Sequence, residues 1–201
     1  MHRTQLRIVA GSLRGRKLAV AVHPGLRPTP QMVREALFSI LGNAVPGRPF
    51  FDVFAGTGIN GLEALSRGAS AATFIERDRR SADDVEGYLR SFGVVDRSHL
   101  VRSDVYRWAE RWRPPADPAN VFLSPPFADL QDRPEDFLAM VRRMQGSLAY
   151  GSVLILQVEV GFELSALPDA ARWDHREYGR NILLFWEPAE EMTNAPSMTK
   201  E

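Results

Sequence analysis

The sequence predicts an α/β protein built on a mostly parallel seven-stranded sheet, and three observations support this. From residue 48 onward, short β-prone runs alternate with helical stretches, as in βα units. A glycine-rich segment joins one of these runs to the helix that follows it, which is typical of nucleotide-binding proteins. The last two β-prone runs have no helix between them. We therefore expect the sheet to end in an antiparallel hairpin.

The N-terminal segment predicts a separate β-hairpin arm with basic residues at its tip. Two short β-prone runs, 6–9 and 17–20, flank a turn that contains two glycines, with too few apolar residues to fold alone. Residues 1–34 hold seven basic and no acidic residues, whereas the rest of the chain holds 18 basic and 25 acidic ones. This asymmetry favours a polyanionic partner. A solvated, charge-rich face is the alternative.

A helix is predicted after the arm. Thr29 can cap it, Pro30 fits its first turn, and Gly42 can end it. Its apolar stripe consists of Met32, Val33, Ala36, Leu37, Ile40 and Leu41.

The alternating region predicts each later element in turn. Strands are expected at 49–54, 71–76, 98–102, 119–123 and 151–158, and helices at 59–67, 78–92, 104–111 and 134–145. Runs 172–178 and 182–186 form the terminal hairpin. The expected organisation is a hairpin arm (1–22), a linker and helix (23–47), a main domain (48–188) and a disordered tail (189–201).

Composition excludes several classes of protein. With 201 residues, 44% of them hydrophobic and 25% charged, the chain reads as soluble and globular. No apolar run is long enough to cross a bilayer or act as a signal peptide, so a cytoplasmic protein without a membrane partner is expected. The absence of cysteine excludes disulfides and thiolate chemistry, and the four histidines lack metal-ligand spacing. No metal site is predicted.

The glycine-rich segment is the first candidate site. Gly56, Gly58 and Gly61 allow a tight turn and let a ligand approach the helix N-terminus, where free N–H groups point outward. Their spacing also fits the dinucleotide fingerprint, with Glu76 twenty residues after Gly56. The spacing therefore leaves open which nucleotide binds. For Asp52 we expect a mixture of two roles, bonding to the loop's own N–H groups and contact with the ligand.

Two further acids follow later strands at the same predicted sheet edge. Glu76 can accept hydrogen bonds from both hydroxyls of a ribose, or it can cap the helix ahead of Arg77. Asp104 can bind the amino group of an adenine, or it can cap the helix that it precedes.

The sequence Ser124-Pro125-Pro126-Phe127, here called the Pro-Pro loop, follows the fourth predicted strand. Two prolines fix φ and remove two N–H donors, so the loop is rigid and presents carbonyl oxygens beside an aromatic ring. This arrangement suits a planar base that carries an exocyclic amine. A stiff connector is the alternative. A hydride-transfer enzyme has no evident need for such a loop.

Together these features resemble the class I S-adenosylmethionine-dependent amino-methyltransferases, which have a Rossmann-like fold. The closer resemblance is to the RsmD family, bacterial methyltransferases of a guanine 2-amino group in small-subunit ribosomal RNA. It covers residues 6–187 and rests on several long motifs. These are Arg7-Ile8, Gly11 and residues 14–18, 24–29, 33–35, 37–38, 52–69 and 122–127.

The resemblance implies roles for individual residues. S-adenosylmethionine would be held by Asp52, Phe54, Ala55, Gly56, Thr57, Gly58, Glu76, Arg77, Asp104 and Val105. The target guanine would be held by Ser124, Pro125, Pro126 and Phe127. The RNA would be contacted by Arg7, Arg14, Arg16, Lys17, Arg27 and Arg34. The implied partner is ribosomal RNA or a small-subunit assembly intermediate, bound by a monomer.

One position departs from the family pattern, in which the Pro-Pro loop begins with Asp or Asn. Ser124 can accept a hydrogen bond, but it reaches less far and carries no charge. The first alternative is therefore an RNA-binding homologue with impaired catalysis. A nicotinamide-dependent dehydrogenase is the second, and a methyltransferase that acts on an amine of DNA or protein is the third.

Overall fold

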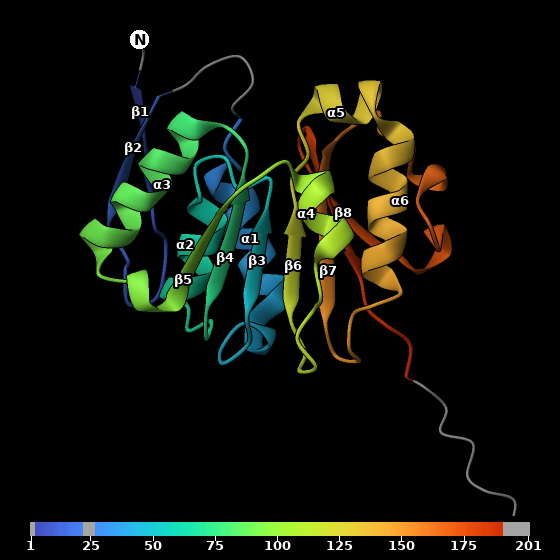
Figure 1. Cartoon of the computed structure of the whole chain (residues 1–201), viewed down its shortest axis with the longest axis horizontal. Helices are drawn as coiled ribbons and strands as arrows, with labels where there is room; N and C mark the ends of the chain where they lie inside the picture. Colours follow the sequence, from blue (N-terminus) through green and yellow to red (C-terminus); the bar gives the residue numbers. More distant parts are fainter. Residues whose placement is uncertain (1–2, 22–26, 191–201) are drawn as a thin grey trace, which may run out of the picture.

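A seven-stranded sheet in the order β5-β4-β3-β6-β7-β9-β8 forms the centre of the molecule (Figure 1). The structure is a computed structural model that describes residues 3–21 and 27–190, so part of the expected linker and most of the expected tail lie outside it. No helix in those ranges is both long and apolar enough to span a membrane. The strands are β1 Arg3–Arg7, β2 Lys17–Ala21, β3 Phe50–Val53, β4 Ala72–Glu76, β5 Ser98–Arg102, β6 Asn120–Leu123, β7 Val153–Glu159, β8 Asp174–Tyr178 and β9 Asn181–Trp186. The α-helices are α1 Gln31–Leu41, α2 Ile59–Ser66, α3 Arg79–Phe92, α4 Val105–Arg111, α5 Phe127–Asp132 and α6 Pro134–Gln145.

The predicted sheet is confirmed. Strands β5, β4, β3, β6 and β7 are parallel, and β9 pairs antiparallel with both β7 and β8. Every predicted element from residue 48 onward agrees with the structure to within two residues at each end. All four residues of β6 are buried, as expected for a central parallel strand covered on both faces. The short helix α5 was not predicted, because it begins directly at the Pro-Pro loop.

Alternating side chains of the sheet form two cores on opposite faces. Phe50, Phe122 and Ile155 pack with α1, whereas Val121 and Leu123 pack with α4 and α6. A third cluster joins β4 to α2, α3 and the N-terminal hairpin. The parallel strands are therefore fixed from both faces, and their carboxyl ends meet at one edge.

The N-terminal hairpin does not project as an arm. Ile8 and Leu18 are fully buried in the cluster that contains α2. The turn between β1 and β2 is fastened to the same helix: the Leu13 N–H donates to Ser66 Oγ (2.9 Å), and Glu63 accepts from two further backbone N–H groups of the turn. The two strands pair antiparallel, as predicted. The hairpin is part of the folded body.

The prediction that Thr29 caps α1 is wrong. The N-cap residue is Pro30, which has an extended backbone and no side-chain cap. The Thr29 hydroxyl instead donates to Gln157 Oε1 (2.7 Å) and accepts from Asn60 Nδ2 (3.0 Å). The predicted end of the helix at Gly42 is confirmed, since this residue is the C-cap with φ +46°.

Candidate active site

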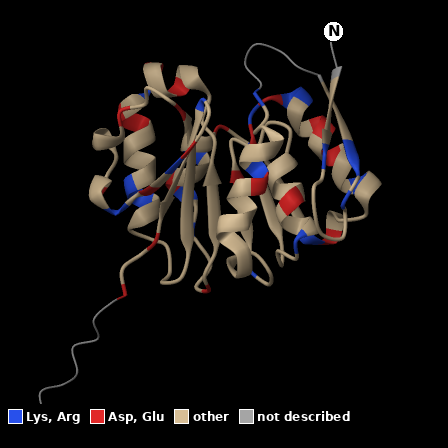
Figure 2. Cartoon of the chain, turned by 180° about the vertical axis from the view of Figure 1, so that it is seen from behind, with Lys and Arg blue, Asp and Glu red and all other residues tan. Residues whose placement is uncertain are grey.

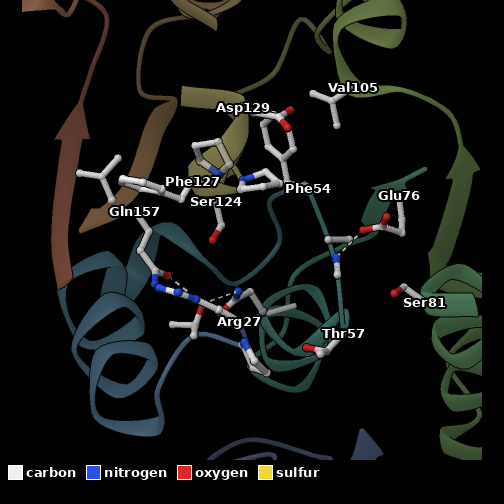
Figure 3. A pocket seen from close by; sticks show the side chains of 18 of the residues that line it. Arg27, Phe54, Thr57, Glu76, Ser81, Val105, Ser124, Phe127, Asp129 and Gln157 are labelled. Carbon is white, nitrogen blue, oxygen red and sulfur yellow. Dashed lines mark hydrogen bonds between the residues drawn. The ribbon is translucent and has the colours of Figure 1, made fainter. Parts of the chain in front are cut away.

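A cavity of about 740 Å³ lies at the carboxyl edge of the sheet (Figure 3). It brings together most of the predicted site residues from β3, β4 and β6 and the segments that follow β5 and precede α1. Those that line it are Arg27, Phe54, Ala55, Gly56, Thr57, Glu76, Arg77, Asp104, Val105, Ser124, Pro125, Pro126 and Phe127. Asp52 and Gly58 do not line it.

The glycine loop (residues 54–58) has a tightly constrained backbone. Gly56 has φ +52°, and Phe54, which has a Cβ, has φ +64°. A left-handed non-glycine residue costs on the order of 1 kcal/mol and occurs most often at functional sites. The Phe54 ring lies edge-on to Tyr106, with 6.0 Å between ring centroids. The Gly56 N–H donates to Glu76 Oε2 at 2.7 Å. The loop is therefore held in one shape before any ligand binds.

Gly58 and Gly61 are required by packing. A Cβ on Gly61 would lie 2.3 Å from the Phe74 ring, and one on Gly58 would lie 2.9 Å from a methyl group of Val85. The two glycines let α2 pack closely against β4 and α3. Their spacing therefore reports helix packing and does not distinguish one nucleotide from another.

Of the two roles predicted for Asp52, the structure shows the structural one, a hydrogen bond to a backbone N–H group. It is 1% exposed, and its Oδ2 accepts from the Gly61 N–H at 2.8 Å. Burial raises the pKa of Asp52 to about 8, against the lowering effect of the Gly61 N–H, and the charge of Glu76 raises it further. Asp52 is not among the residues that line the cavity, and its contact with a ligand stays a prediction. Asp52 holds the first turn of α2 against β3.

Glu76 fixes the loop through both of its oxygens. Oε2 accepts from Gly56 and Oε1 accepts from the Asp78 N–H, each at 2.7 Å. A carboxylate has about four acceptor positions, so each oxygen keeps one for a ligand in the cavity. The alternative that Glu76 caps α3 is wrong, because the cap is Asp78, whose Oδ1 accepts from the Ser81 N–H.

Asp104 caps α4, as one of its two predicted roles requires. Its Oδ1 accepts from the N–H groups of Tyr106 (3.1 Å) and Arg107 (3.2 Å). Its Oδ2 lies 3.7 Å from the Arg77 guanidinium and 3.4 Å from that of Arg133. The adenine contact stays a prediction, and an adenine amine would share this oxygen with two cations.

The Pro-Pro loop lines the cavity and begins beside the glycine loop, because the Ser124 N–H donates to the carbonyl oxygen of Val53 at 3.3 Å. Ser124 Oγ points into the cavity (Figure 3) and makes no hydrogen bond to the described part of the chain. Phe127, the first residue of α5, is 58% exposed. Buried Asp129 holds α5 in place, because its Oδ1 lies 3.3 Å from the Arg77 guanidinium. An exposed aromatic face is thus fixed beside a free hydroxyl.

A polar wall opposite the glycine loop was missed by sequence reasoning. Thr29 donates to Gln157 Oε1, and Gln157 Nε2 donates to Asn181 Oδ1 at 3.0 Å. Arg27 forms a 2.6 Å ion pair with Glu159. No local pattern indicated this wall, because it depends on the pairing of β9 with β7, which brings the start of β9 to the edge where β7 ends. No three His, Asp or Glu side chains within 3–21 and 27–190 are arranged to hold a metal ion.

The prediction that Arg34 contacts RNA is wrong. Its side chain is 1% exposed, lies 3.5 Å from Glu63 Oε2 and donates to the carbonyl oxygens of Thr29 and Arg7. Burial lowers the pKa of Arg34, and the charge of Glu63 opposes this. Arg34 therefore fastens the segment before α1 to the hairpin and cannot reach RNA.

The other basic residues of the hairpin divide into two groups. Arg14 and Arg16 are exposed, but they lie in the turn fastened to the carboxyl end of α2, whereas the cavity lies at its amino end, about 12 Å away by helix rise. Arg7 and Lys17 line a second hollow of about 520 Å³, which shares Pro28, Thr29 and Pro30 with the cavity. Figure 2 shows basic residues along the hairpin below the N-terminus. Only the second group adjoins the cavity.

Comparisons with known proteins agree with this geometry. Residues 6–187 match the model of the family described as Conserved hypothetical protein 95. Ribosomal RNA small subunit methyltransferase D of Escherichia coli strain K12 is 36% identical over 174 residues, which cover 86% of this chain and 84% of that protein. The solved structure of methyltransferase yhhF from Escherichia coli superposes with a TM-score of 0.75 and 32% identity, covering 93% of this chain and all of that one. A 16S rRNA N2 methyltransferase (RsmC) from Thermus thermophilus, solved with AdoMet and guanosine, has a TM-score of 0.70 at 20% identity and covers 94% of this chain and 50% of that one, which shows the fold alone.

Proposed function

Because the chain belongs to the Conserved hypothetical protein 95 family, we propose that it transfers a methyl group from S-adenosylmethionine to the 2-amino group of a guanine in small-subunit ribosomal RNA. One observation carries the proposal: a single cavity is lined both by the rigid glycine loop and by the Pro-Pro loop with its exposed Phe127. A cofactor and a planar base can therefore meet in it. A dehydrogenase would leave the Pro-Pro loop without a use.

The residues at the glycine loop fit this cofactor. Glu76 has acceptor positions left for the two ribose hydroxyls, and Val105 with Asp104 forms the wall where an adenine would lie. Gly56 and Thr57, which line the cavity, would lie beside the amino-acid portion. S-adenosylmethionine supplies a methyl group on a sulfonium, which needs only an amine lone pair aimed in line at its carbon.

The Pro-Pro loop would position the amine. The carbonyl oxygen of Pro125 and the Ser124 hydroxyl can each accept a hydrogen bond from the 2-amino group, which turns the nitrogen lone pair out of conjugation with the ring. The ring would stack on Phe127, which is 58% exposed. Stacking there requires an unpaired or flipped-out guanine.

Ribosomal RNA would reach this site across the hairpin. Arg7 and Lys17 line the hollow that adjoins the cavity, and Arg27 lines the cavity itself, next to Pro28, which both hollows share. These cations can bind phosphates on either side of the flipped base. We propose that the protein acts as a cytoplasmic monomer, on free RNA or on a small-subunit assembly intermediate.

The Phe127→Ala variant tests this function. Transfer of tritiated methyl to undermethylated small-subunit RNA should be abolished, because the base loses its stacking surface, while the affinity for S-adenosylhomocysteine measured by titration calorimetry stays unchanged. Tyr150→Ala is a matched control, since Tyr150 is 60% exposed and does not line the cavity. Equal loss of methyl transfer and cofactor affinity in Phe127→Ala, or full activity, would contradict the proposed role of the Pro-Pro loop.

A further inference from the structure

A third hollow, of about 700 Å³, lies against α4 beside the cavity, and no function has been assigned to it above. We call it the α4 surface and define it by Arg102, Arg107, Trp108, Arg111, Trp112 and Arg113. It shares Arg77 and Asp104 with the main cavity, so the two hollows adjoin at the end where an adenine would lie.

Two arginines of this surface carry uncompensated charge. Arg107 and Arg111 are both exposed, and neither guanidinium has an ion pair or hydrogen bond with the described part of the chain. They lie one turn apart on α4, a spacing at which like charges repel. Arg107 also lies in the first turn of α4, where the helix dipole disfavours a cation. A bound anion would relieve both effects.

Other exposed arginines of this protein differ in whether an acid pairs with them. Arg90 on α3 pairs with Glu86 at 2.7 Å, and Arg102 on β5, at the rim of the α4 surface, pairs with Asp83 and Glu86. Arg107 and Arg111 form no such pair with a described residue, although Glu110 lines the same hollow. What sets these two arginines apart is therefore their place in a hollow beside the main cavity, together with two indole rings.

Two indole rings, those of Trp108 and Trp112, line the same hollow as these cations. The centroids of Trp108 and Trp112 are 5.3 Å apart, and the Trp112 ring packs edge-on against Phe51 at 5.1 Å, which holds the pair rigid. Both rings are partly exposed, and neither indole N–H has a hydrogen bond to a described residue. Arginines interleaved with fixed aromatic rings are typical of surfaces that bind single-stranded nucleic acid.

We propose that the α4 surface binds an unpaired segment of the RNA substrate next to the methylated guanine. Phosphates lie at Arg107 and Arg111, and a base stacks on Trp108 or Trp112. The proposal rests on the function proposed above, since it needs an RNA whose flipped base enters the adjoining cavity. An acidic protein segment would satisfy the arginines but would make no use of the indole faces, so RNA is favoured.

The test measures RNA affinity as a function of salt concentration. A labelled single-stranded RNA oligonucleotide is titrated by fluorescence anisotropy with the wild type and with Arg107→Gln/Arg111→Gln. Each lost phosphate contact lowers the slope of log Kd against log salt by about 0.7, so the double variant should show a slope smaller by about 1.4 and weaker binding. The affinity for S-adenosylhomocysteine should not change. Arg90→Gln/Arg176→Gln is the control, because it removes two exposed charges outside the α4 surface.

A second measurement reports stacking directly. The protein has four tryptophans, and Trp173 and Trp186 are buried, so quenching of intrinsic fluorescence by RNA reports Trp108 and Trp112. RNA should quench the wild type and polyglutamate should not.

Three outcomes would overturn the proposal. If Arg107→Gln/Arg111→Gln has the same salt slope as the control variant, or if RNA does not quench the wild type, the proposed role of the α4 surface is refuted. The proposed methyltransferase function is unaffected by either result if the wild type methylates RNA. Failure of the wild type to bind RNA at all removes both.

Discussion

Replacing Glu63 by glutamine should loosen the N-terminal hairpin and leave the buried Arg34 guanidinium without its carboxylate partner. The Glu63 carboxylate is fully buried on α2 and accepts from the N–H groups of Val9 (2.9 Å) and Ala10 (3.1 Å) in the hairpin turn. It also accepts from Arg67 Nε at 2.9 Å and lies 3.5 Å from Arg34 Nε. In Glu63→Gln an amide NH₂ replaces one of these oxygens and faces a donor.

The expected loss in the free energy of unfolding follows from the groups that lose a hydrogen-bond or ion-pair partner in Glu63→Gln. Removing one member of a buried ion pair costs about 3–5 kcal/mol, because the other charge stays buried without compensation. Arg34 keeps two carbonyl acceptors, which moderates this cost, whereas one backbone N–H loses its acceptor at about 1–3 kcal/mol. We expect a net loss of about 4 kcal/mol, a large share of the ~5–15 kcal/mol that stabilises a typical domain.

Urea denaturation followed by circular dichroism measures this loss. Glu86→Gln is a matched control, because Glu86 makes two ion pairs on the surface and its replacement should cost less than about 1 kcal/mol. Limited proteolysis should cleave the hairpin of Glu63→Gln before the rest of the chain. If Glu63→Gln loses no more free energy of unfolding than Glu86→Gln, the reasoning about the buried pair is refuted.

Three further predictions concern Gly61 on α2, Asp52 on β3 and Ser124 in the Pro-Pro loop. Gly61→Ala should lower the free energy of unfolding by about 1–3 kcal/mol in urea denaturation, because the new Cβ would lie 2.3 Å from the Phe74 ring. The control is Gly87→Ala on α3, whose Cβ meets nothing within 4 Å and which should be neutral or stabilising. Equal effects of the two substitutions would contradict the packing argument. Unfolded Asp52 ionises near pH 3.8 and folded Asp52 near pH 8, so the native state holds an extra proton between these values and the wild type loses stability as pH rises, by up to about 1.4 kcal/mol per pH unit. Asp52→Asn should remove this decline in denaturation series from pH 5 to pH 8, and an unchanged decline would assign it to other groups. Ser124→Asp should raise the turnover of methyl transfer by on the order of 100-fold at constant cofactor affinity, since a carboxylate stabilises positive charge on the attacking nitrogen; no gain would show that the hydroxyl suffices.

Much of the fold could be predicted because βα alternation is a local pattern. Apolar runs of strand length, followed by amphipathic helices, identify each element without knowledge of its neighbours. The carboxyl ends of parallel strands meet at one edge, which is why Glu76, Asp104 and Ser124 could be assigned to one site from sequence alone.

What could not be predicted depends on contacts between distant segments. Arg34 looks like its basic neighbours in the sequence, and only the packing of α1 against the hairpin and Glu63 shows that it is buried. The site wall formed by Gln157 and Asn181 depends on how β9 pairs with β7, which the sequence of either strand does not specify. Thr29 fits the pattern of a helix cap, but two partners at the sheet edge take its hydroxyl instead.

The docking of the hairpin turn on α2 has a consequence for how a substrate is chosen. The helix begins next to the glycine loop and ends at the residue that holds the turn, so one short rigid rod sets the separation between them. An RNA that contacted the hairpin turn as well as the cavity would have to place its guanine at that fixed distance from its phosphates. We therefore expect the choice of substrate to depend on the folded shape of the RNA as well as on the sequence around the guanine.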